Sequence, residues 1–136
     1  MRRTKYFKTL FLIAGLWNVV AALICWIGSI FMASLFFDMF GMQPPPSLFP
    51  FHAMFGFIIF FGVGYFIVSH DVSKNHGIIV IGMLGKIIFC IDCIITFLLK
   101  EANIMLVSTG IVDLVFVILF IDFLLAIRKG TKQVSA

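Results

Sequence analysis

The chain has 136 residues, of which 62% are hydrophobic and only 12% are charged, with a formal net charge of +4. A soluble domain contains about a quarter charged residues and under half apolar ones, so this composition excludes an ordinary soluble protein. The apolar residues lie in long blocks, which indicates an integral membrane protein surrounded by the lipid bilayer. The basic residues gather at the ends of these blocks, which favours contact with anionic lipid headgroups and not with nucleic acid.

Four apolar stretches are each long enough to cross the bilayer as a helix, because a hydrocarbon core of about 30 Å takes about twenty helical residues. In chain order, the predicted transmembrane helices cover about residues 10–37, 51–69, 78–99 and 104–127. The short connections between them predict antiparallel neighbours in a four-helix bundle. We therefore expect an all-α fold in which residues 1–136 form a single membrane domain.

The first stretch follows a basic segment, as the core of a secretory signal peptide does. Its apolar run far exceeds the roughly 7–15 residues of a signal-peptide core, so we expect an uncleaved helix. Basic residues also set the predicted orientation, because Lys and Arg concentrate in cytoplasmic segments. Outside the spans, Lys100 is the one basic residue expected on the far side, and all the others fall on the side of the two termini. Both termini are therefore predicted to be cytoplasmic, in a multi-pass protein of the cell membrane.

Several polar residues lie inside the apolar stretches. A charge at the bilayer centre costs about 2.5–3.5 kcal/mol on insertion scales, so such groups usually face the protein interior. At a rise of about 1.5 Å per residue, Lys86 and Asn18 lie about 12 Å from the cytoplasmic end, and Asp92 and Asp113 about 21 Å. This depth predicts an inner polar layer that contains Asn18, Tyr65 and Lys86, and an outer layer that contains Asp92 and Asp113.

Lys86 and Asp92 stand six residues apart, which places them about 120° apart around a helix. We therefore expect Lys86 to face Asn18, and Asp92 to face Asp113. Two adjacent carboxylates in a low dielectric do not both ionise unless Lys86 or an ion neutralises them. Such a group of residues suits a proton relay, and it equally suits a static hydrogen-bonded core. Asp122 lies near a helix end, so we expect it to reach the membrane interface.

Cys90 and Cys93 form a CxxC motif, which invites a redox interpretation. Reactive CxxC pairs usually sit at a helix N-terminus, whereas this pair is predicted at mid-helix, and the loops contain no partner cysteine. We expect these cysteines and Cys25 to be structural, with a three-thiol site as the alternative. His52 opens the second predicted span, and His70 and His76 flank the connection that follows it; no pair has metal-binding spacing, so no metal or cofactor is predicted.

One short motif marks each of the four stretches: Trp17-Asn18, Gly64-Tyr65, Gly85-Lys86 and Asp113-Leu114-Val115-Phe116. Together they resemble small, mostly uncharacterised bacterial four-helix membrane proteins of the DoxX-like type, over nearly the whole chain. The resemblance implies a four-helix bundle in the bacterial inner membrane and carries no defined activity. Some DoxX-like proteins are associated with redox or quinone systems, but the loops here lack the cysteines that would support that association.

Three functions fit these observations. The leading hypothesis is a non-enzymatic protein whose buried Asn18, Lys86, Asp92 and Asp113 bind or transport a small solute, an ion or a proton. Four short helices enclose little volume, so this hypothesis includes a homo-oligomer. The alternative is a structural or accessory subunit of a membrane complex, in which the polar residues only specify helix packing. A third is a membrane enzyme acting on lipid or quinone, which requires an apolar pocket open to the bilayer beside Lys86.

Overall fold

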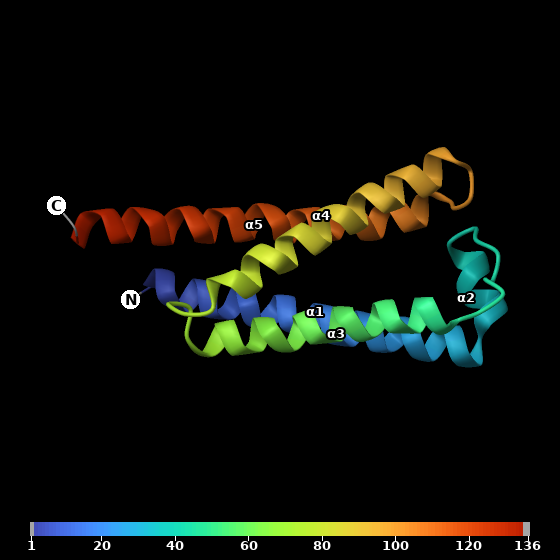
Figure 1. Ribbon diagram of the computed structural model, residues 1–136, viewed down its shortest axis with the longest axis horizontal. Helices are drawn as coiled ribbons and strands as arrows, with labels where there is room; N and C mark the ends of the chain where they lie inside the picture. Colours follow the sequence, from blue (N-terminus) through green and yellow to red (C-terminus); the bar gives the residue numbers. More distant parts are fainter. Residues whose placement is uncertain (1, 135–136) are drawn as a thin grey trace.

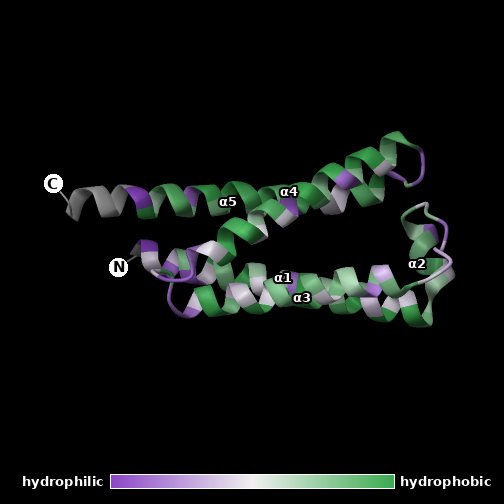
Figure 2. Ribbon diagram, in the orientation of Figure 1, coloured by the Kyte–Doolittle hydropathy of each residue, from purple (hydrophilic) through white to green (hydrophobic). Residues whose placement is uncertain are grey.

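A computed structural model describes residues 2–134 of the chain, with side chains described from residue 3 to residue 128. Its regular elements are the helices α1 (Arg2–Phe31), α2 (Ala33–Met39), α3 (Phe49–His70), α4 (His76–Leu98) and α5 (Ile104–Val134). Four of them, α1, α3, α4 and α5, are long and apolar enough to cross a membrane. Figure 2 shows that hydrophobic residues dominate these helices and that hydrophilic residues concentrate in the loops and near the chain ends. The prediction of an all-helical chain with four apolar spans is confirmed at this level.

The single helix predicted over residues 10–37 is wrong, because the chain breaks at Met32 between α1 and α2. Met32 has φ −137° and ψ 45°, which lies outside helical geometry. After the break α2 packs against the end of α1, where a side chain at Gly28 would meet the ring of Phe36 at 3.3 Å. The ring of Phe37 is fully buried and lies 5.1 Å from that of Phe51 in α3. Burial of these aromatic rings favours the break over a continuous apolar helix.

The four long helices associate as two pairs. α1 packs along α3 and α4 packs along α5, whereas α3 and α4 contact each other far less. Figure 1 shows both chain ends at one end of the molecule, together with the α3–α4 connection. It shows α2 and the α4–α5 connection at the opposite end, called here the α2 end. The loosely joined boundary between the two pairs is where a cavity can form.

Two glycines allow α1 and α3 to approach closely. A side chain on Gly62 would come within 2.7 Å of Val19 Cγ2 and 3.1 Å of the Gly15 carbonyl oxygen. A side chain on Gly15 would come within 2.6 Å of the Phe66 ring. Helices in lipid associate mainly through van der Waals packing and interhelical hydrogen bonds, so small residues at the crossing point strengthen the contact. These glycines therefore hold α1 and α3 together as one unit.

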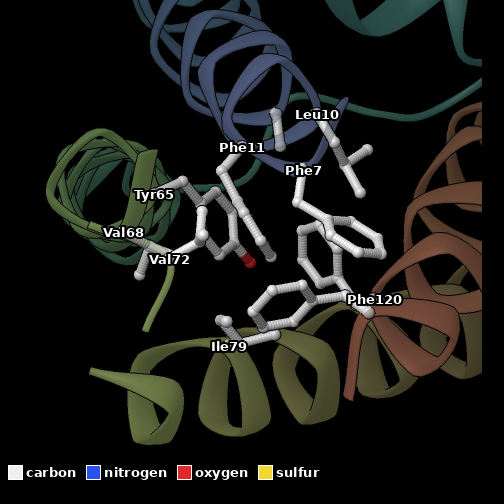
Figure 3. Close-up of a cluster of buried hydrophobic side chains, with 10 residues drawn as sticks. Phe7, Leu10, Phe11, Tyr65, Val68, Val72, Ile79 and Phe120 are labelled. Carbon is white, nitrogen blue, oxygen red and sulfur yellow. The ribbon is translucent and has the colours of Figure 1, made fainter. Parts of the chain in front are cut away.

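A cluster of buried side chains joins the two pairs near the end that carries the termini. We call it the apolar cluster; Figure 3 shows that aromatic rings from α1, α3 and α5 meet there above α4. Its rings interlock: Phe11 lies 5.1 Å from Phe120 and 4.9 Å from Phe123, and Tyr65 lies 5.1 Å from Phe120. The cluster consists of Phe7, Leu10, Phe11, Ala14, Tyr65, Val68, Val72, Ile79, Phe120 and Phe123.

Asn103 joins the two pairs at the α2 end. Its backbone N–H donates to the carbonyl of Phe40 at 2.7 Å, and its side-chain amide donates to the carbonyl of Met39 at 3.0 Å. Its side-chain oxygen accepts from the backbone N–H of Met105 at 2.9 Å, which caps the start of α5. The two pairs are thus connected at both ends, and the functional candidates lie between these connections.

Candidate functional site: a buried ion pair between two cavities

Lys86 of α4 forms an ion pair with Asp113 of α5 in the middle of the apolar spans. The Lys86 Nζ lies 2.5 Å from the Asp113 Oδ1, and the two side chains are only 6% and 17% exposed. An unpaired charge at this depth would be strongly unfavourable, because neither lipid nor apolar protein replaces its hydration. The pair removes that cost by bringing the charges together, so α4 and α5 can carry both groups inside the apolar region.

Asn18 connects this ion pair to the other helix pair. Its side-chain oxygen accepts a hydrogen bond from Lys86 Nζ at 3.0 Å, and its amide nitrogen donates to the carbonyl of Ile58 in α3 at 3.4 Å. Lys86 Nζ also lies 5.3 Å from the centroid of the Phe116 ring, within the range of a cation–π contact. We call Asn18, Lys86 and Asp113 the polar cluster; it links α1, α3, α4 and α5.

The geometry confirms the expected contact of Lys86 with Asn18 and corrects the predicted division into two layers. Asp113 was placed with Asp92 in an outer layer, yet its carboxylate binds Lys86. The long lysine side chain spans the depth that separates the two backbone positions. Asp92 is exposed on the protein surface and, within the described part of the chain, its carboxylate takes part in no hydrogen bond or ion pair. Asp122 is also exposed, as expected for a residue near the interface.

Tyr65 does not join the predicted inner layer by a hydrogen bond. The residue is fully buried in the apolar cluster, and its hydroxyl has no hydrogen-bond partner among the described residues. The hydroxyl occupies space beside Gly82 of α4, where an added side-chain carbon would overlap it. Figure 3 shows that the hydroxyl points into the interior between the helices. Tyr65 therefore lies close to the polar cluster without being part of it.

A first cavity lies between α3 and α4 and reaches Lys86. This α3–α4 cavity has a volume of about 400 Å³. Its lining is mostly aromatic and aliphatic, with the polar groups of Asn18, Tyr65, Lys86, Asp92 and Asp113 along it. Phe57 and Ile88 line it while remaining 65% and 59% exposed, so the cavity reaches the outer apolar surface of the bundle.

A second cavity extends from the polar cluster toward α2. This α2-side cavity has a volume of about 310 Å³ and is lined by residues of all five helices. Asn18, Asp92 and Asp113 line it as well as the α3–α4 cavity, so the two cavities adjoin at the polar cluster. Further polar side chains of the α2-side cavity are Cys93 and Thr96 of α4 and Thr109 of α5, and α1 contributes Trp17 and Cys25.

The three cysteines are free thiols spread over two helices. Cys90 and Cys93 are buried in α4, and Cys25 of α1 is partly buried. A side chain at Gly110 of α5 would lie 3.2 Å from the Cys90 Cα and 3.3 Å from the Cys93 Cβ, so both cysteines occupy the contact between α4 and α5. Within the described residues no group of three His, Cys, Asp or Glu side chains could hold a metal ion. A redox role for the thiols stays untested.

Sequence reasoning missed the residues that shape the space around the polar cluster. Met54, Ile58 and Phe89 line both cavities, and nothing distinguishes them in the sequence from the many apolar residues that face lipid. Asn103 was also missed, although an Asn directly before a predicted helix is a recognisable capping signal. The contact of Phe116 with Lys86 depends on how α5 is rotated, which the sequence alone does not specify.

Comparison of the chain with protein-family models, with characterised proteins and with solved structures gave no match. The resemblance to DoxX-like proteins therefore stays a prediction.

Proposed function

We propose that the chain is a multi-pass protein of the cell membrane, the inner membrane in a bacterium, with four antiparallel spans and both termini in the cytoplasm. The location of both chain ends at one end of the molecule supports this arrangement (Figure 1). The distribution of basic residues supports the orientation, because Lys74 in the α3–α4 connection lies on the same side as the basic terminal segments. Large apolar side chains are exposed on all four long helices, as contact with lipid requires.

Within that membrane protein, the polar cluster binds a small polar solute, an ion or a proton and passes it across the bilayer. The observation that carries this proposal is the ion pair between Lys86 and Asp113, which is buried at mid-span yet borders two adjoining cavities. Ionisable groups that face a cavity inside a membrane typically mark a substrate or proton pathway. An ion pair that served packing alone would require no cavity beside it.

Along the long axis of the bundle, the two sides of the polar cluster differ in open space. The α2-side cavity extends from Asp113 toward α2, whereas the interlocked rings of the apolar cluster fill the space toward the chain ends. A solute or proton that reaches Asp113 from the α2 end therefore meets a barrier beyond it. Passage requires a second arrangement in which the two helix pairs move relative to each other, and the small contact between α3 and α4 permits such a movement. Assembly of several copies is part of the proposal, because one bundle encloses little volume.

The test is a flux assay in proteoliposomes with the variants Lys86→Met and Asp113→Asn. Each variant removes one charge of the ion pair, so we expect loss of solute uptake or of proton movement detected with a pH-sensitive dye. Asp122→Asn is the matched control, because it makes the same chemical change on the same helix at an exposed position that lines neither cavity. Unaltered fluxes and proton dependence in both cluster variants, with a panel of ions and small solutes, contradict the proposal.

A structural or accessory subunit is the second candidate, and the bonding of Lys86 favours it. The ammonium group already has two oxygen partners and an aromatic ring from this chain, and these contacts join α4 to α1 and α5. In that case the same variants lower thermal stability or complex assembly in step with any loss of flux. A variant that keeps wild-type stability and assembly but loses flux excludes this candidate.

A further inference from the structure

The α3–α4 cavity is lined by a buried hydroxyl that none of the described residues satisfies. Tyr65 lines this cavity, none of its surface is exposed, and its hydroxyl has no partner among the described residues. A buried hydroxyl without a hydrogen bond is unfavourable, and a phenylalanine would fill the same space without that cost. Gly82 leaves the room that the hydroxyl occupies, because any larger residue there would displace it. A hydrogen-bonding partner from outside the chain would explain why position 65 is a tyrosine and why position 82 is a glycine.

The cavity is elongated and opens toward the acyl chains of the bilayer. Its lining runs from Pro50 at the start of α3 to Tyr65, a separation of about 22 Å along the helix at about 1.5 Å per residue. That length covers most of a hydrocarbon core of about 30 Å. Its volume of about 400 Å³ falls within the usual range for small-molecule sites, which is about 300–1,000 Å³. The exposed rings and aliphatic groups at its rim admit an apolar chain sideways from the bilayer.

The charges around the cavity select against an ionised headgroup. Lys86 is already neutralised by Asp113, so it offers no net positive charge to an anion. Asp92, the other carboxylate of the lining, stands ten residues further along α4 than Gly82, which lies beside Tyr65; at about 15 Å it is too distant to pair with a head at Tyr65. A cationic head would compete with Lys86 for Asp113 and face the ammonium group at close range. A neutral head with a carbonyl or hydroxyl oxygen meets none of these costs, and it gives the Tyr65 hydroxyl the partner that it lacks.

We propose that the α3–α4 cavity binds a neutral amphiphile, with a single apolar chain along α3 and α4 and a hydroxyl or carbonyl head at Tyr65. This binding does not require that a solute or proton moves through the polar cluster, although the same cavity borders that cluster. The ligand reaches the site from within the membrane, and its chain lies against side chains of both helix pairs: Phe57, Ile58 and Phe61 from α3, and Ile88 and Phe89 from α4.

The experiment uses a 16-carbon primary alcohol with a photoactivatable diazirine in its chain, added to the full-length protein in lipid nanodiscs. We expect labelled peptides from α3 and α4, and we expect excess hexadecanol to compete with the label. Hexadecanoate and hexadecylammonium carry the same chain with charged heads, so they should compete at least about tenfold less well. Labelling that is spread evenly over all lipid-facing helices, or competition that is strongest with a charged head, overturns the proposal.

Two variants locate the site and a third serves as the control. Tyr65→Phe removes only the hydroxyl and should weaken competition by hexadecanol about tenfold, the loss of one hydrogen bond. Gly85→Leu fills the cavity and should abolish specific labelling; its first side-chain carbon meets Phe61 at an ordinary 3.9 Å, so the fold is retained. Gly56→Leu makes the same change on α3 where nothing lies within 4 Å, and it should label as wild type does.

Unchanged labelling in Gly85→Leu means that the alcohol reports only the lipid shell, and it refutes the site. Unchanged competition in Tyr65→Phe means that the hydroxyl is satisfied by water alone, and it refutes the assigned head position. The competition series on the wild-type protein depends on neither variant, so the choice among neutral, anionic and cationic heads is tested even if a variant is poorly expressed.

Discussion

The ion pair between Lys86 and Asp113 leads to a quantitative prediction about stability. Asp113→Leu removes the carboxylate at near-constant size and leaves the Lys86 ammonium with Asn18 and the Phe116 ring. Removing one partner of a buried pair costs about 3–5 kcal/mol in soluble proteins, whereas polar contacts between helices in lipid are worth at most about 1.7 kcal/mol. Because two partners remain, we expect a loss of about 2.5 kcal/mol from the free energy of unfolding, between these limits.

Lys86→Met should lower the free energy of unfolding by less, about 1.5 kcal/mol. The reason is that the unpaired carboxyl group of Asp113, beside a cavity, can take up a proton and become neutral. The double variant Lys86→Met with Asp113→Leu leaves no charge at either position. Its free energy of unfolding should fall by only about 1 kcal/mol, since apolar replacements of a buried pair are often near neutral. The coupling between the two positions is then about 3 kcal/mol, at the upper end of measured pairwise values.

Reversible unfolding in mixed lipid–detergent micelles, followed by SDS titration, measures all four proteins on one scale. Asp122→Asn is the control and should stay within about 0.5 kcal/mol of wild type, because it changes an exposed residue. A double variant whose loss equals the combined loss of the two single variants would show that Lys86 and Asp113 are not coupled. That result would refute the assignment of the pair as the main polar contact between α4 and α5.

Three further predictions concern the connections around the site. Gly62→Leu places a side chain within 2.7 Å of Val19, so it should separate α1 from α3 and cost about 1–3 kcal/mol in the same unfolding assay. Asn103→Ala removes the bond to α2 and the cap of α5, so it should cost about 1–2 kcal/mol and speed amide hydrogen exchange in α2. The hydroxyl and the backbone amide of Ser73, followed by Lys74, lower the pKa of Asp71 to about 2, and NMR titration of its carboxyl carbon should show a midpoint there.

The sign of the pH effect at Asp71 follows from the lowered pKa of the folded state. The bonds from Ser73 stabilise the α3–α4 connection above the usual carboxyl pKa of 3.8, and they are lost as the pH falls through about 2. Ser73→Ala should raise the midpoint toward 3.8, and an unchanged midpoint would contradict the assignment.

Controls exist for the other two predictions. Gly56→Leu should leave the α1–α3 contact intact, because nothing lies within 4 Å of that position. Ser108→Ala removes a hydroxyl that bonds only within α5, so hydrogen exchange in α2 should stay at the wild-type rate. Equal destabilisation by Gly62→Leu and Gly56→Leu would refute the close contact of α1 with α3 at Gly62. Hydrogen exchange in α2 at the wild-type rate in the Asn103→Ala variant would refute the contact of Asn103 with α2.

The sequence by itself determined the four apolar spans and the presence of polar groups inside them. Both are local properties, since the bilayer sets the length of an apolar helix and a buried charge such as Lys86 stands out against Leu, Ile and Phe. Depth along the helices also predicted that Lys86 would face Asn18, because both positions lie a similar number of residues from the same membrane face. These predictions needed no knowledge of how the helices pack.

Only the tertiary structure decided which groups pair and where space remains. Asp113 pairs with Lys86 and not with Asp92, because the lysine side chain spans the difference in depth and the rotation of α5 brings the carboxylate to it. Helix rotation and the break at Met32 follow from packing between different helices, such as the ring of Phe37 against that of Phe51 in α3, which no local pattern records. The cavities and the unpartnered Tyr65 hydroxyl arise from the same packing, so the features that suggest a ligand become visible only when the helices are assembled.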